Sequence, residues 1–149
     1  MSPGRADREV LRRHLIALRA AVKTLKGFQG CSVDDLKRDA GLRWTVERGL
    51  QVVSQNVLDL ATHVAASAGR DVPDYATAID VLGDLQVLPR EFAADFRGVA
   101  GLRNVLVHGY LEVDLQVMHR VLQEQLGDFE TFAEAMESLA RGDADEDAG

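Results

Sequence analysis

Cysteine is nearly absent from this chain, which carries one, Cys31, among its 149 residues. A lone thiol cannot form an intramolecular disulfide, so the sequence excludes a disulfide-stapled scaffold and fits a reducing cytosol. Apolar runs of about 18 residues, the length that crosses a membrane, are also lacking. The N-terminal residues show no signal-like apolar stretch. We therefore expect a cytoplasmic protein that does not associate with a membrane.

An excess of positive charge is missing as well. The formal net charge is −7 at pH 7, and four acids fall within the last seven residues: Asp143, Asp145, Glu146 and Asp147. This balance argues against a protein that binds nucleic acid through bulk electrostatics. An RNA substrate would have to be held by a local site or by a composite surface.

The sequence also lacks the residue patterns of metal and cofactor sites. No set of histidine, cysteine, aspartate and glutamate residues has zinc-site spacing, and no glycine-rich loop is suited to cradle a phosphate. We therefore expect no metal ion and no cofactor.

Helical periodicity is what the chain has instead, together with only three prolines. Apolar residues recur every three or four positions, which is typical of amphipathic helices. Ser32 and Asp35 have the spacing of a weak capping box. The predicted helices cover approximately residues 7–26 and 42–68, and another begins at about Arg90. Two further helices follow Asp74 and Asp114, which are plausible N-caps.

These elements predict an all-α domain over residues 5–141, built as an antiparallel bundle of four or five helices. After Asp114, apolar residues repeat every seven positions, which predicts a packing seam within the bundle or against a second copy of the chain. Residues 142–149 are small and acidic, and we expect them to form a disordered tail.

Arg103 interrupts the apolar stripe of the helix that begins next to Arg90. On a continuous helix with about 100° per residue, Arg103 falls within about 20° of Phe92, in the middle of that stripe. Burying an unpaired charge costs several kcal/mol, so Arg103 needs a partner or a polar cleft. His108 would diverge from it on a straight helix, unless Gly109 ends or distorts the helix or a second copy completes the cleft.

Arginine and histidine together suit RNA cleavage. Histidine titrates near neutral pH and can both accept and donate a proton. Arginine keeps its charge and offers a planar set of donors to phosphate oxygens. Such a pair can activate a ribose 2′-hydroxyl and stabilise the phosphate transition state without a metal. DNA lacks that hydroxyl and would be excluded.

The residue types alone leave other roles open. Arg103 would also fit a structural salt bridge across the bundle or a dimer. His108 would fit a helix end, where it contacts terminal carbonyls. Tyr110 would fit a packed ring with an exposed hydroxyl, and Asn104 a residue that only caps or orients.

The segment 103–110, Arg-Asn-Val-Leu-Val-His-Gly-Tyr, resembles the Arg-x(4–6)-His motif of the HEPN superfamily, with a polar residue directly after the arginine. The tyrosine two residues after the histidine matches the Arg-x4-His-x-Tyr form of the HepT-like toxins. The resemblance covers roughly residues 5–141, and its further matches are at residues 44–51, 75–88, 100–102 and 113–114.

The resemblance implies a HEPN-like all-α homodimer whose two motifs meet in a cleft at the interface. It implies a metal-independent endoribonuclease toxin of a type VII-like toxin–antitoxin system, acting on tRNA or mRNA. By position, Arg103 and His108 become the catalytic pair and Asn104 their support. Tyr110 becomes the residue that accepts AMP from a partner, a minimal nucleotidyltransferase that serves as the antitoxin.

A second hypothesis keeps the partner and removes the turnover. In it, the chain is a non-catalytic helical binding module that positions the substrate of a nucleotidyltransferase. Metal-free cleavage of RNA distinguishes the two hypotheses.

Overall fold

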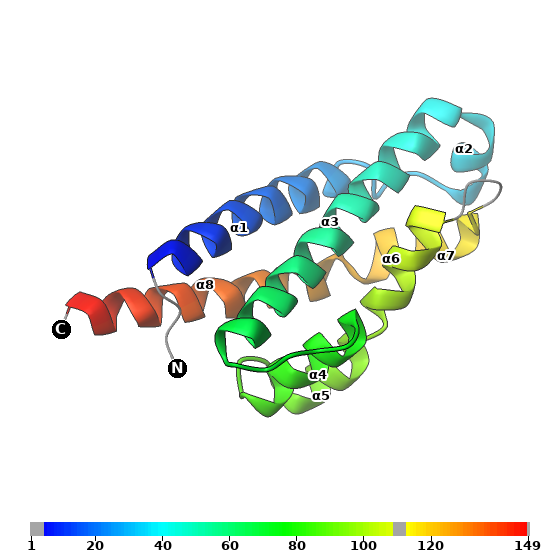
Figure 1. The fold of residues 1–149 in the computed structure, drawn as a ribbon. Coiled ribbons are helices and arrows are strands. Elements are labelled where there is room, and N and C mark those ends of the chain that lie inside the picture. The colour runs from blue at the N-terminus through cyan, green and yellow to red at the C-terminus, as the bar shows by residue number, and fades with distance from the viewer. Residues whose placement is uncertain (1–4, 109–112, 149) are drawn as a thin grey trace.

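The computed structural model describes the backbone of residues 5–108 and 113–148, and the side chains of residues 8–106 and 113–142. The described residues form eight helices and no strand, so the prediction of an all-α fold is confirmed (Figure 1). The helices are α1 (Arg5–Lys26), α2 (Val33–Arg38), α3 (Ala40–Ser67), α4 (Tyr75–Asp84), α5 (Arg90–Phe96), α6 (Val99–His108), α7 (Leu115–Glu124) and α8 (Leu126–Ala148).

Three long helices, α1, α3 and α8, form the body of the bundle (Figure 1). Helix α3 runs back alongside α1, and α8 packs against α1. Arg19 and Lys26 of α1 form ion pairs with Glu137 and Glu130 of α8. Helices α4 and α5 lie at one end, and α2 and α7 pack together at the other. One continuous apolar core runs through the bundle, and its largest fully buried side chains include Leu11, Leu18, Leu50, Leu60, Leu82, Phe129 and Phe132.

The local signals at the helix starts behave as predicted. Ser32 and Asp35 form the capping box of α2, in which each side chain accepts a hydrogen bond from the other residue's backbone. Asp74 accepts from the Thr77 amide at the start of α4, and Asp114 caps α7. These caps satisfy backbone donors that have no partner inside a helix.

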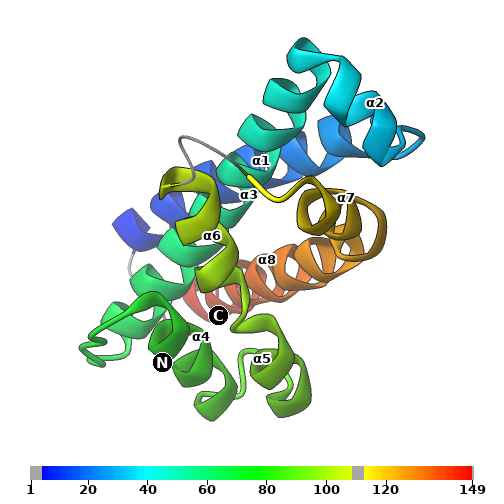
Figure 2. The same cartoon turned by 90° about the vertical axis from the view of Figure 1, so that its right-hand side faces the viewer.

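The prediction of one continuous helix running on from Arg90 is wrong. This segment forms two helices, α5 and α6, which are separated at Arg97 and Gly98. Two backbone bonds, from Ala100 to Arg97 and from Gly101 to Gly98, tighten the chain into turns there. Glycine weakens helix continuity, and the break lets each half meet a different neighbour. Helix α5 packs on α4, whereas α6 lies along α3 (Figure 2).

The long helix predicted after Asp114 is also two helices, α7 and α8, with a break at Gln125. The seven-residue seam survives the break, since Leu122, Phe129 and Met136 are buried in the same core and Leu115 packs against it. The bend is tolerated because these side chains need a common interior, not a common helix axis.

The end of the domain also differs from the prediction that a tail begins at residue 142. The backbone of α8 stays helical to Ala148, through Gly142 and the acidic residues after it. Glycine is permitted within a helix at a modest cost, and the segment contains no proline to stop it. The domain limits of 5 and 141 remain a prediction. In the part of the chain that the structure describes, no helix has both the length and the apolar character needed to cross a membrane.

Candidate active site

Arg103 lies half-buried where α6 packs against α3. Its Nε donates to Oε1 of Gln55 on α3 at 2.9 Å, and its Nη1 donates to Oδ1 of Asn104 at 3.2 Å. Its guanidinium carbon lies 5.5 Å from the centroid of the Tyr75 ring, within the range of a cation–π contact. The predicted need for a polar partner is therefore met by two amide oxygens and an aromatic face.

Gln55 is itself held in place by a carboxylate. Its Nε2 donates to Oδ1 of Asp59, one turn further along α3, at 2.8 Å. The same nitrogen lies 3.5 Å from the Tyr75 hydroxyl. Because Asp59 accepts from the amide nitrogen, the amide oxygen faces Arg103. Asp59 thus orients Gln55, and Gln55 in turn orients Arg103.

The charge of Arg103 is not neutralised within the described part of the chain. None of the described carboxylates forms an ion pair with it, and its two hydrogen-bond acceptors there are uncharged amides. An arginine carries five N–H donors, so donors remain after those two bonds. The salt bridge across the bundle that the sequence left open is therefore not seen among these residues, whose acceptors occupy two of the five N–H donors of Arg103.

Sequence reasoning missed Gln55 and Asp59. A signal was present, because Gln55, Asp59 and Thr62 are spaced four and three residues apart on α3. That spacing places three polar residues on one face of a helix whose other faces are largely apolar. A polar stripe of this kind predicts a polar neighbour, and α6 supplies it.

The other predicted site residues are only partly described. His108 is the last residue of α6, and its side chain lies outside the described residues. Gly109 and Tyr110 lie outside them altogether. The structure therefore brings Arg103 and Asn104 together. The approach of His108 to Arg103 and the position of Tyr110 stay predictions.

A pocket of about 500 Å³ lies beside this arginine, between α3, the start of α4 and α6. Tyr75 and Asn104, which both contact Arg103, belong to its wall. Asp74 also lines it, and hydrogen bonds from Thr77, chiefly from its backbone amide, lower the pKa of that carboxyl group. Among the described residues, no three histidine, cysteine, aspartate or glutamate side chains are grouped to hold a metal ion.

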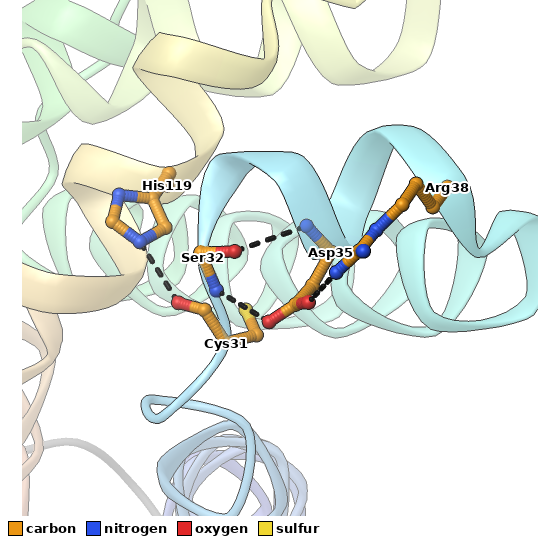
Figure 3. A network of polar contacts seen from close by, with 5 residues as sticks. All are labelled: Cys31, Ser32, Asp35, Arg38 and His119. Atoms are coloured by element: carbon orange, nitrogen blue, oxygen red, sulfur yellow. Dashed lines mark hydrogen bonds and ion pairs between the residues drawn. The ribbon is translucent and has the colours of Figure 1, made fainter.

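A second polar cluster, shown in Figure 3, joins α2 to α7. His119 of α7 donates from Nε2 to the backbone oxygen of Cys31 at 2.9 Å. Asp35 accepts from the Ser32 amide and from Arg38, and these bonds lower its pKa, with the backbone bond as the larger cause. Burial and the nearby Asp35 raise the pKa of the Cys31 thiol, which favours its protonated form. This cluster fixes the α1–α3 connection and is structural.

Comparison with known proteins gives concordant matches. The sequence matches the family described as Ribonuclease HepT-like over residues 18–136. It is 22% identical over 131 residues to the mRNA nuclease HepT of Shewanella oneidensis, and this alignment covers 87% of this chain and 98% of that protein. It is 33% identical over 92 residues to the tRNA nuclease HepT of Aphanizomenon flos-aquae, and this alignment covers 60% of this chain and 62% of that protein.

The fold has a solved counterpart. A tri-AMPylated HEPN toxin of Shewanella oneidensis, in complex with MNT antitoxin, superposes with a TM-score of 0.75 and 22% identity. The likeness covers 87% of this chain and 97% of that chain. At this level of identity it establishes a common architecture, and the HEPN-like fold expected from the sequence is confirmed.

Proposed function

Because the chain belongs to the HepT-like ribonuclease family, we propose that it is a metal-independent endoribonuclease toxin with Arg103 and His108 as its catalytic pair. The family match confirms the resemblance seen in the sequence and the ribonuclease class that it implied. The two similar nucleases are named as acting on mRNA and on tRNA, so both kinds of RNA are candidate substrates.

The observation that carries the proposal is the setting of Arg103. It is half-buried, and its two hydrogen-bond partners among the described residues are uncharged amides that occupy two of its five N–H donors. A guanidinium in this state binds a phosphate and stabilises the extra charge of its transition state. Asn104 supports it by accepting one of its N–H bonds.

His108 supplies the proton chemistry. A neutral imidazole removes the proton of a ribose 2′-hydroxyl as that oxygen attacks the adjacent phosphorus, or an imidazolium donates a proton to the departing 5′-oxygen. The new P–O2′ bond forms as the P–O5′ bond breaks. The products are a 2′,3′-cyclic phosphate and a 5′-hydroxyl end, and the reaction as proposed uses no metal ion.

The site is completed by a homodimer in this proposal. A second copy brings its own motif to the same cleft, which explains how a chain with a net charge of −7 gathers positive charge around RNA. An RNA substrate fits a cytoplasmic location.

The test is cleavage of RNA by protein purified without its partner, in the presence of EDTA. We expect His108→Ala and Arg103→Gln each to lower the rate about a hundredfold or more, since they remove a proton-transfer group and a transition-state donor. Arg97→Gln is the matched control, because Arg97 is an exposed arginine paired with Asp80, and it keeps the wild-type rate. Undiminished cleavage by His108→Ala contradicts the assignment, and an inactive wild type favours the binding module.

Control of the toxin is assigned to Tyr110. The HEPN toxin that shares this fold is tri-AMPylated and bound to MNT antitoxin. We expect this chain to partner a minimal nucleotidyltransferase that transfers AMP from ATP to the Tyr110 hydroxyl, releasing pyrophosphate. The adduct adds bulk and negative charge that compete with RNA for Arg103.

Mass spectrometry after coexpression with the partner checks this assignment. Wild type is expected to gain one or more AMP masses and Tyr110→Phe none, whereas Tyr75→Phe, which removes the other tyrosine hydroxyl of the chain, keeps them. AMP adducts that persist in Tyr110→Phe would show that another residue is modified.

A further inference from the structure

We propose that the pocket beside Arg103 binds the base of an unpaired ribonucleotide next to the phosphate that is cleaved. We call it the base pocket, and define it by Thr62 on α3, Tyr75 and Ala76 on α4, and Ala100 and Asn104 on α6. The inference rests on the proposed function and adds a class of substrate to it: single-stranded RNA with one base turned out of its stack.

The base pocket shares two walls with the arginine site. Asn104 accepts a hydrogen bond from Arg103 at 3.2 Å, and the Tyr75 ring lies under the guanidinium at 5.5 Å. Both residues also line the pocket. A phosphate bound by Arg103 therefore has the pocket as its immediate neighbour, where the base of an adjoining nucleotide can enter.

The walls suit a nucleobase. Tyr75 offers an aromatic ring, and Ala76 and Ala100 add apolar surface, while the Asn104 amide can donate and accept at a polar edge. The volume of about 500 Å³ lies in the range of small-molecule sites. RNA-binding proteins recognise single strands in this way, by stacking a base on an aromatic side chain and bonding its edge.

Thr62 gives an independent reason to expect a ligand with polar atoms. The hydroxyls of Thr24, Thr45 and Thr131 each donate to the carbonyl four residues earlier in their helix. The Thr62 hydroxyl is buried and has no hydrogen-bond partner among the described residues. An unsatisfied buried hydroxyl is unfavourable. Because rotation about the Cα–Cβ bond exchanges hydroxyl and methyl group, Thr62 can present its oxygen to a base in the pocket.

Charge explains why a base contact is needed. The net charge of −7 weakens any binding that relies on phosphates alone. A base held in the pocket supplies affinity that does not depend on charge, and it excludes paired RNA, whose bases remain stacked in the helix.

The experiment uses short single-stranded oligonucleotides with one ribose, so that only one phosphate can be cleaved. The nucleotide 5′ or 3′ of that phosphate carries either a base or no base. Wild type is expected to cleave the base-bearing form at least about tenfold faster, in kcat/KM, at one of the two positions, as base stacking on an aromatic side chain predicts. Equal rates for base-bearing and abasic forms at both positions overturn the inference.

Ala76→Phe tests the pocket itself, because the larger side chain fills it. The ratio of base-bearing to abasic cleavage is expected to fall to about one, from the tenfold preference that stacking predicts. Ala94→Phe, on the exposed side of α5 and away from the pocket, keeps the wild-type ratio. Thr62→Val, which keeps the side-chain shape, changes the preference among the four bases at that position. Should Ala76→Phe fail to fold, Ala100→Leu fills the pocket from α6. A filled pocket with an unchanged ratio overturns the inference.

Binding separates this inference from the ribonuclease assignment. The same oligonucleotides, fluorescently labelled, are titrated against His108→Ala protein, and anisotropy reports the affinity without turnover. Tighter binding of the base-bearing form, lost in the double variant with Ala76→Phe, supports the pocket even if wild type cleaves nothing. Cleavage by wild type at rates that do not depend on the base supports the ribonuclease assignment and contradicts the proposal that the pocket binds a base.

Discussion

At the scale of single residues, Arg103 is held by neutral acceptors among the residues that the structure describes. Gln55 and Asn104 each accept one N–H bond from Arg103, and the Tyr75 ring covers its face. A carboxylate in the place of Gln55 would bind Arg103 more strongly and cancel its charge. The amide positions the guanidinium without competing for its charge, and Asp59 fixes the amide from behind.

Substitution of Gln55 separates positioning from charge. Gln55→Leu removes the acceptor, and we expect kcat to fall about tenfold with a smaller change in KM, since a hydrogen bond to a charged group contributes roughly 1.5–3 kcal/mol. Gln55→Glu keeps an acceptor but adds a negative charge, and we expect a larger loss of kcat. Steady-state kinetics on a single-stranded RNA measures both.

The control for this pair is Gln51→Leu, which lies one turn earlier on α3 and contacts Arg48 instead. It is expected to leave kcat unchanged. A Gln55→Glu variant as active as wild type would show that the charge of Arg103 is not what the reaction uses.

At the scale of helices, close packing of α1 on α3 depends on Gly49. A Cβ atom at this position would come within 2.6 Å of Leu25 Cδ2, a fully buried side chain of α1. At Gly127, near the start of α8, an added Cβ meets nothing within 4 Å. These two helical glycines therefore have different effects. Gly49 permits a close contact between helices, whereas Gly127 only lowers the helix propensity of α8.

Substitution to alanine is expected to change stability in opposite directions at these two positions. Gly49→Ala forces Leu25 to move in a packed core and is expected to lower the free energy of unfolding by about 1–3 kcal/mol. Gly127→Ala is expected to raise it by up to about 1 kcal/mol through helix propensity. Urea unfolding followed by circular dichroism measures both, and a Gly49→Ala protein as stable as wild type would show that the α1–α3 contact adjusts freely.

At the scale of the whole molecule, α6 carries both Arg103 and an exposed apolar side chain. Val105 is 48% exposed, two residues after Arg103, on the helix that the proposed homodimer cleft requires at its interface. Ile16 is 64% exposed on α1, a helix at the back of the bundle as seen in Figure 2. These two residues offer a matched pair for testing which face a second copy covers.

Val105→Asp is expected to shift the protein from dimer to monomer and to lower RNA cleavage with it, because an aspartate would be buried without a partner at the interface. Ile16→Asp is expected to leave both properties unchanged. Analytical ultracentrifugation and cleavage assays at the same protein concentration measure them together. A Val105→Asp monomer with full activity contradicts a site shared between two copies.

The sequence by itself determined the helical class, the caps at Ser32, Asp74 and Asp114, and the family through its Arg-x4-His-x-Tyr segment. These follow from periodicity and spacing, which are local properties of a chain. Only the tertiary structure decided where the last two long helices break, because each half packs on a different neighbour. It alone decided what holds Arg103, since Gln55 lies 48 residues away in the sequence and only packing of α6 on α3 brings the two together.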